Sequence, residues 1–223
     1  MTATMQRWSM DALGRESLRL VQEPVPQPGP GEVRVRVNAV ALNYRDKMVI
    51  EGTMPIPLSF PFTPASDMAG VVDSIGEGVT RFKPGARVIS TFFPEWIDGK
   101  PQADARDLPY KTSGGYFQGM LAEYVIVSEN ALVASPESLD DAEASTLPCA
   151  GLTAWFALVE RGHLRAGQSV LVQGTGGVAL FALQIAKAHG AEVFVSSGSD
   201  EKLARAKKLG ASQGINRLKG DWA

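Results

Sequence analysis

The stretch VLVQGTGGVALFALQIAK, residues 170–187, decides how the rest of the chain is interpreted. Residues 169–173 form a short apolar run that ends in a cluster of glycines, which is typical of a strand buried on both faces. From Val178 to Lys187 the sequence contains neither glycine nor proline, as a helix requires. The pattern therefore predicts a strand, a tight turn and a helix in immediate succession.

The turn between these elements has the sequence GTGGVA, residues 174–179, and its spacing fits G-x-G-x-x-G/A. Glycines let a ligand approach the backbone closely, and the start of a helix offers free N–H groups and partial positive charge to a phosphate. We therefore expect a dinucleotide site that uses Gly174, Thr175, Gly176, Gly177 and Val178. The alternative is a strand–helix turn whose glycines only pack and bind nothing.

Composition limits the classes of partner and location. Of the 223 residues, 44% are hydrophobic and 21% are charged, and the net charge is −2 without a basic run that would favour nucleic acid. The sequence contains neither a long apolar stretch for a membrane nor an apolar signal core at its start. The single cysteine, Cys149, fits a reducing compartment. We expect a cytoplasmic protein that binds neither membrane nor nucleic acid.

Proline marks a domain boundary. All 14 prolines lie between Pro24 and Pro148, and proline is disfavoured in helix interiors and central strands. Residues 1–148 are therefore interpreted as a loop-rich β domain and residues 149–223 as α/β. Strands expected near residues 170, 193 and 214 make only one βαβαβ half of a doubly wound sheet. Because Asp221 would cap a helix with no sequence behind it, we expect an N-terminal fragment or an incomplete sequence.

Other elements follow from local patterns. Alternation of Val with Arg in residues 32–42 is typical of a half-buried strand, and Asn43 and Asp140 are expected to cap helices. Segment 93–119 forms either a wall of a substrate pocket or a packed surface loop. Further strands are expected at residues 5–10, 17–23, 67–76, 86–92, 121–127, 191–196 and 213–216, and helices at 44–51, 149–160 and 199–209.

Several motifs in a fixed order resemble those of a known family. They are PGPGEVRVRV, NYRD, PASDMAGVV, GVTRFKPGARV, LAEYV, PCAGLTAWFAL, VLVQGTGGVALFALQIAKAHGAEV and SDEKLARAKKLGA. They resemble the zinc-independent, quinone oxidoreductase-like branch of the medium-chain dehydrogenase/reductase superfamily, over essentially all 223 residues. The resemblance implies a mixed fold, with a GroES-like irregular β domain followed by the first half of a Rossmann α/β sheet.

The resemblance also bears on zinc. Zinc alcohol dehydrogenases of the superfamily have a Cys at the position that matches Asn43, a His–Glu pair at Ser66 and Asp67, and a third ligand at Cys149. Only Cys149 is unchanged from those ligands, and one thiolate cannot form a catalytic zinc site, which needs about three protein ligands. We therefore expect no metal site, with Cys149 as a small packing residue.

Charge near the second strand bears on the cofactor. NAD-binding folds place an acidic residue roughly 20 residues after the glycines, whereas Ser197 and Gly198 occupy that region here. Lys202 follows on the first helical turn, and the resemblance also implicates Ser197 and Lys202 in a 2′-phosphate site, over which Asn216 and Arg217 would close. We expect a preference for NADP(H) over NAD(H), which the nearby Asp200 and Glu201 weaken. The alternative for Lys202 is a solvated helix face.

The resemblance assigns the reacting groups as well. Asn43 and Tyr44 match residues that line the active site, where Tyr44 would donate a hydrogen bond to the substrate oxygen and Asn43 would orient the ribose or substrate. Simple core packing is the alternative for Tyr44. Thr153 matches a threonine near the nicotinamide half of the cofactor. Asp46 is expected to be structural.

These features favour an NAD(P)H-dependent oxidoreductase that transfers hydride to a quinone, enone or other carbonyl compound without zinc. One alternative is an alcohol dehydrogenase-type activity without zinc, and another is an NADPH-binding protein without catalysis. The resemblance also implies a homodimer for a complete chain.

Overall fold

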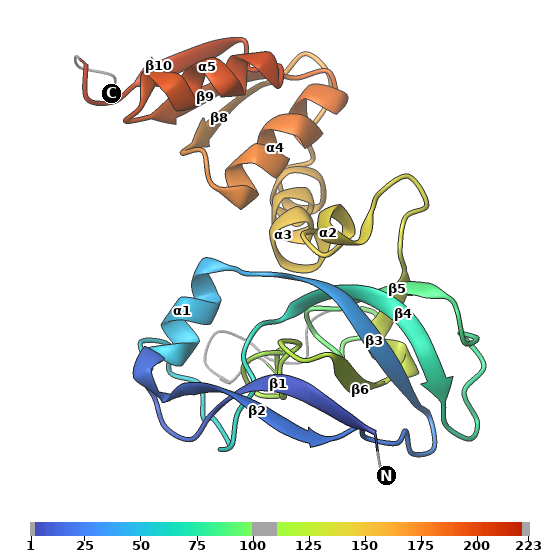
Figure 1. The fold of residues 1–223 in the computed structure, drawn as a ribbon. Helices are drawn as coiled ribbons and strands as arrows, with labels where there is room; N and C mark the ends of the chain where they lie inside the picture. The colour runs from blue at the N-terminus through green and yellow to red at the C-terminus, as the bar shows by residue number, and fades with distance from the viewer. Residues whose placement is uncertain (1–2, 100–110, 220–223) are drawn as a thin grey trace. The chain divides into compact units, whose positions relative to one another are not determined.

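The computed structural model describes residues 3–99 and 111–219, and the chain divides into two units (Figure 1). The N-terminal unit is Met1–Cys149 and the C-terminal unit is Ala150–Ala223. Residues 100–110, within the long segment expected at 93–119, and the helix cap expected at Asp221 lie outside the described residues.

Five strands of the N-terminal unit form one antiparallel sheet, in the order β6-β3-β4-β5-β7 (Figure 1). Their bounds are β3 Glu32–Ala41, β4 Asp67–Ile75, β5 Arg87–Ser90, β6 Tyr124–Ser128 and β7 Leu132–Ala134. The alternation of Val and Arg predicted for residues 32–42 places Val33 and Val35 in the core with no exposed surface. Four of these strands were predicted, whereas the three-residue β7 was not, because it is too short to show a period.

A two-stranded antiparallel sheet, β1 (Thr4–Met10) and β2 (Leu18–Pro24), completes the β structure of this unit. Helix α1 (Tyr44–Ile50) packs near the end of β1, where Met10, Val49 and Phe62 form a small buried cluster. Helix α2 (Asp141–Ala144) begins after Asp140, whose carboxylate accepts the Glu143 N–H at 2.8 Å, as the predicted cap requires.

The C-terminal unit contains a three-stranded parallel sheet in the order β10-β9-β8. The elements follow one another as β8 (Ser169–Gln173), α4 (Gly177–Ala188), β9 (Glu192–Ser197), α5 (Asp200–Lys208) and β10 (Gln213–Asn216). Both helices lie on one face of the sheet (Figure 1), as right-handed crossovers require for this strand order. Leu183, Ala186 and Val193 pack there without exposed surface. The strand–turn–helix prediction for residues 169–187 and the fold class are confirmed, but β8 is not buried on both faces in this chain, since Leu171 is 48% exposed.

The segment predicted as one helix at residues 149–160 has a less regular form. Helix α3 (Leu152–Trp155) is flanked by wider helical turns at Leu147–Gly151 and Phe156–Arg161. Pro148 lies in the first of these turns, where its missing N–H is consistent with the loss of regular helical bonding. In the described parts of the chain, no helix has both the length and the apolar character that crossing a membrane requires.

Candidate active site

The site in the N-terminal unit is built on the first turn of α1. Asn43 has an extended backbone and is the N-cap residue of this helix. The Asp46 carboxylate accepts the backbone N–H of Asn43 at 2.7 Å, and the Asp46 N–H donates to the Asn43 carbonyl at 3.0 Å. This reciprocal arrangement satisfies groups that helix ends leave unpaired. It fixes the direction in which α1 leaves β3.

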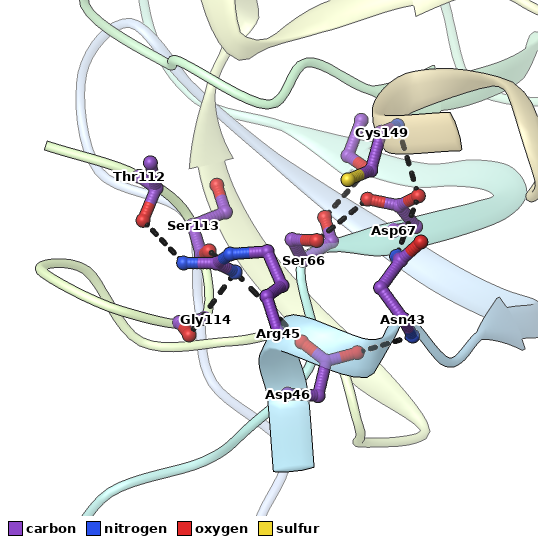
Figure 2. A network of polar contacts seen from close by, with 10 residues as sticks. Asn43, Arg45, Asp46, Ser66, Asp67, Thr112, Ser113, Gly114 and Cys149 are labelled. Carbon is purple, nitrogen blue, oxygen red and sulfur yellow. Dashed lines mark hydrogen bonds and ion pairs between the residues drawn. The ribbon is translucent and has the colours of Figure 1, made fainter. Parts of the chain in front are cut away.

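Asp67 is the centre of the polar network (Figure 2). It is the first residue of β4 and has no exposed surface. Its Oδ2 accepts the side-chain amide of Asn43 and the backbone N–H of Cys149, both at 3.0 Å. Its Oδ1 accepts the Ser66 hydroxyl at 2.6 Å. One buried carboxylate thus joins three segments that are distant in the sequence.

Arg45 lies on the other side of this network (Figure 2). Its guanidinium donates to Thr112 Oγ1 at 2.8 Å and to the carbonyl oxygens of Ser113 and Gly114 at 3.2 and 3.4 Å. It also lies 4.9 Å from the centre of the Phe92 ring, within the range of a cation–π interaction. Only 12% of the Arg45 side chain is exposed, so this arginine fastens α1 to the segment at residues 112–114.

Burial dominates the electrostatics of the site. It raises the pKa of Asp46 to about 6, against the opposing effects of the Asn43 N–H and the Arg45 charge. It also raises the pKa of Asp67, which the hydrogen bonds from Ser66 and Asn43 oppose. Burial lowers the pKa of Arg45, although a guanidinium remains charged in proteins. The two acids therefore depend on nearby donors and on Arg45 for their ionised forms.

The backbone before Asp67 is held in an uncommon conformation. Ala65 has φ 72°, in the left-handed region that costs a non-glycine residue about 1–3 kcal/mol. Its carbonyl accepts the Met120 N–H at 2.8 Å, and two glycines pack against it. A Cβ at Gly119 would lie 2.1 Å from the Pro64 carbonyl oxygen, and one at Gly114 would lie 2.5 Å from Ala65. The close approach of this segment therefore requires both glycines.

Tyr44 differs from its neighbours because 75% of it is exposed. Its ring lies 6.0 Å from the Lys47 ammonium, and its backbone belongs to the first turn of α1. This exposure excludes the core-packing alternative within the chain described here. Contact with a substrate stays a prediction.

The glycine turn of the C-terminal unit leaves space beside its backbone. Gly174 has φ 97°, which favours glycine, and its N–H donates to the Ser196 carbonyl at 2.8 Å. A Cβ at Gly174 or Gly176 would meet nothing within 4 Å, and one at Gly177 would lie 3.7 Å from Ala150. Gly176 caps α4 without a side-chain hydrogen bond, so the first N–H groups of this helix are not occupied by its cap. The open space and the helix start fit a pyrophosphate.

Other predicted cofactor residues lie around this sheet. The carboxyl ends of β8, β9 and β10 share one edge, as they do in every parallel sheet of this kind. Ser197 is buried at the end of β9, and its carbonyl accepts the Arg217 N–H at 3.1 Å. A Cβ at Gly198 would lie 3.6 Å from the Arg217 guanidinium. Lys202 is exposed on the first turn of α5, whereas Thr153 and Val178 are exposed on α3 and α4.

The residues that match the zinc-ligand positions come together but do not form a metal-binding set. In the described ranges, no group of three or more His, Cys, Asp or Glu side chains is placed to hold a metal. The amide nitrogen of Asn43 and the backbone N–H of Cys149 both point at Asp67, where they occupy its Oδ2. These positions thus offer two side chains of a zinc-ligand type, the Cys149 thiol and the Asp67 carboxylate, whereas a catalytic zinc takes about three protein ligands.

Sequence reasoning missed the roles of Arg45 and Asp67. Both are charged residues in short motifs, and charged residues are rarely buried, so composition gave no sign of a buried network. The Asn43-x-x-Asp46 spacing was the one available signal, since it matches the spacing of a capping box.

Two family models match the chain. Residues 29–137 match the alcohol dehydrogenase GroES-like domain, and residues 177–223 match the zinc-binding dehydrogenase model. Among curated relatives, a zinc-type alcohol dehydrogenase-like protein of Schizosaccharomyces pombe is 44% identical over 216 residues, covering 94% of this chain and 61% of its own length. A quinone oxidoreductase of Rattus norvegicus is 34% identical over 212 residues, which cover 94% of this chain and 57% of that relative's length.

A solved structure shows the same fold. A protein of Sinorhizobium meliloti 1021, assigned as an alcohol dehydrogenase, is 60% identical with a TM-score of 0.96, over 100% of this chain and 65% of that one. The chain thus spans about 60% of the length of the curated relatives described above. The matched models, relatives and fold show that the chain belongs to the medium-chain dehydrogenase/reductase superfamily.

Proposed function

We propose that this protein is an NADP(H)-dependent oxidoreductase that transfers hydride to a quinone, enone or other carbonyl compound without zinc. The observation that carries the proposal is the hydrogen-bonded network around Asp67. It occupies, with protein donors, the positions that match zinc ligands elsewhere in the superfamily. We assign substrate handling to residues 1–148 and nucleotide binding to residues 149–223.

The cofactor residues are proposed from the C-terminal unit. Gly174, Gly176 and Gly177, with Thr175 and Val178 beside them, would cradle the pyrophosphate at the start of α4. Ser197, Gly198, Lys202 and Arg217 would surround the 2′-phosphate, and Thr153 would lie toward the nicotinamide half. The NADP(H) preference is supported by the absence of a carboxylate at residues 197 and 198, where β9 ends.

The chemistry is proposed from the N-terminal unit. When bound, NADPH would supply a hydride to the substrate carbon, and negative charge would develop on the substrate oxygen. Tyr44 would donate a hydrogen bond to that oxygen, as electrostatic stabilisation of the transition state requires. The Asn43 amide, held by Asp67, would orient the ribose or substrate.

The direct test is NADPH oxidation by the purified protein with a panel of quinones, enones, aldehydes and ketones. We expect turnover to persist after a chelator has removed metal, when elemental analysis finds less than about 0.1 zinc per chain. Tyr44→Phe should lower kcat by about tenfold to a hundredfold, with Tyr124→Phe, on β6, as the control.

Other outcomes would contradict the proposal. Turnover of alcohols alone would favour an alcohol dehydrogenase-type activity, and NADPH binding without turnover of any substrate would favour a binding protein. Stoichiometric zinc that is required for turnover would contradict zinc independence.

A further inference from the structure

An acidic residue lies close to the proposed 2′-phosphate site. Asp200 is the first residue of α5, three positions after Ser197 at the end of β9. A free carboxylate in this region would hydrogen-bond a ribose hydroxyl and repel a phosphate, which would favour NAD(H). The proposed preference for NADP(H) therefore depends on the state of this carboxylate.

Both oxygens of Asp200 already have partners. Its Oδ1 accepts the side-chain amide of Asn216 at 2.6 Å, and its Oδ2 accepts the Lys219 ammonium at 2.5 Å. The Lys219 and Asn216 donors hold the pKa of Asp200 below its usual value. The carboxylate is thus paired with a unit positive charge, and each of its oxygens already accepts a hydrogen bond from the protein.

The two donors also come from the segment that carries Arg217. Asn216 ends β10, and its side-chain carbonyl accepts the Leu218 N–H at 3.0 Å, while its backbone carbonyl accepts the Lys219 N–H at 3.0 Å. Arg217 itself is tied to Ser197 through its backbone N–H. Residues 216–219 therefore form a short turn that is fastened to α5 on one side and to β9 on the other.

We infer that Asp200, Asn216 and Lys219 form a latch that determines the preference for a 2′-phosphate. Lys219 cancels the charge of Asp200, and Asn216 holds the turn so that Arg217 stays beside Gly198. This inference rests on the proposed function, since it refines the nucleotide choice of the same site. Surface ion pairs contribute little to stability, so the effect of the latch is on ligand charge rather than on folding.

The test measures binding of 2′,5′-ADP and 5′-AMP, two probes that differ by the 2′-phosphate alone, by isothermal titration calorimetry on the full chain. The wild type should bind 2′,5′-ADP more tightly. Lys219→Met should weaken 2′,5′-ADP binding roughly threefold to tenfold and leave 5′-AMP unchanged, because it exposes one unit of negative charge. The loss should shrink in 0.5 M salt, since screening is strong there.

A double variant separates charge cancellation from direct contact. If Lys219 acts by cancelling Asp200, then Asp200→Asn combined with Lys219→Met should restore near wild-type affinity for 2′,5′-ADP. An affinity as low as that of Lys219→Met alone would overturn the inference and assign Lys219 to the phosphate itself. Lys208→Met, in the last turn of α5, removes the same charge and is the control; it should leave the affinity for both probes unchanged.

The remaining outcomes distinguish the inference from the proposed function. A wild type that prefers 2′,5′-ADP, with Lys219→Met indistinguishable from it, would overturn the latch and leave the function standing. Equal binding of both probes would overturn the NADP(H) preference and the latch together. Failure of both probes to bind at millimolar concentration would overturn nucleotide binding by this site.

Discussion

Substituting Asp46 by Asn should make the N-terminal unit less sensitive to pH. Burial raises the folded-state pKa of Asp46 from 3.8 to about 6. A group whose pKa is raised on folding contributes stability below its unfolded pKa and loses that contribution as the pH rises through its folded pKa. Ionised Asp46 therefore costs stability at neutral pH, and the cost develops between about pH 4 and pH 6.

The magnitude follows from the size of the pKa shift. About 2 pKa units, at 1.36 kcal/mol each, correspond to about 3 kcal/mol. Asp46→Asn cannot ionise, yet its amide oxygen can still accept the Asn43 N–H that Asp46 accepts now. The free energy of unfolding of the variant, minus that of the wild type, should rise by about 3 kcal/mol between pH 4 and pH 7. Asp67 titrates in both proteins and largely cancels in this difference.

The assay needs a signal from the N-terminal unit alone. Trp8 and Trp96 lie in that unit, so substitution of Trp155 and Trp222 by Phe leaves fluorescence that reports its unfolding. Urea titrations at pH 4, 5, 6 and 7 give the free energy of unfolding at each pH. Asp140→Asn, a solvent-facing helix cap, is the control and should show no such rise. Parallel pH profiles for Asp46→Asn and the wild type would refute the assignment of a raised pKa to Asp46.

Substitutions at three further positions test other parts of the molecule. Asp67→Ala leaves buried donors without an acceptor, so it should lower the free energy of unfolding, measured in urea, by about 3–5 kcal/mol. Asp67→Asn keeps an acceptor oxygen and should lower it by less than half of that. Equal losses for the two variants would argue against the network. Gly119→Ala should lower the melting temperature by about 5 °C or more, because its Cβ would overlap the Pro64 carbonyl; an unchanged melting temperature would contradict the close packing. At Gly176 a Cβ would meet nothing within 4 Å and φ is ordinary, so Gly176→Ala should change the free energy of unfolding by less than about 1 kcal/mol. The same variant should lower NADPH affinity, measured by fluorescence titration, roughly tenfold. Unchanged affinity would exclude pyrophosphate binding at these glycines.

The parts of the fold that could be predicted are those with a local signal. The change from a short apolar run to glycines and then to a helix at residues 169–187 is such a signal, as is the Val and Arg alternation of β3. The helix predicted at residues 199–209 corresponds to α5, whose ends carry such local signals, because Ser199 is its N-cap and Gly210, with φ 109°, follows its C-cap. Strand β7 has only three residues, so no period could reveal it.

The candidate site was less predictable because its contacts are long-range. Asp67 meets Asn43 across 24 residues and Cys149 across 82, and no sequence pattern encodes pairings at such separations. The resemblance grouped these positions as relics of a metal site, but it could not show that hydrogen bonds join them. Arg45 was missed for a related reason, since its partners at residues 112–114 are 67–69 positions away.

The network offers a reason why an exposed Tyr44 would be held in place for its proposed chemical role. Its neighbours are fixed on both sides, because Asn43 is bonded to Asp67 and Arg45 is bonded to the segment at residues 112–114. In the same helical turn, the Asp46 carboxylate accepts the backbone N–H of Asn43. A side chain on such a rigid turn loses little further backbone entropy when it binds, which is the advantage that preorganised sites have over mobile loops. In this arrangement buried hydrogen bonds, rather than a bound metal, would keep the proposed hydrogen-bond donor in position.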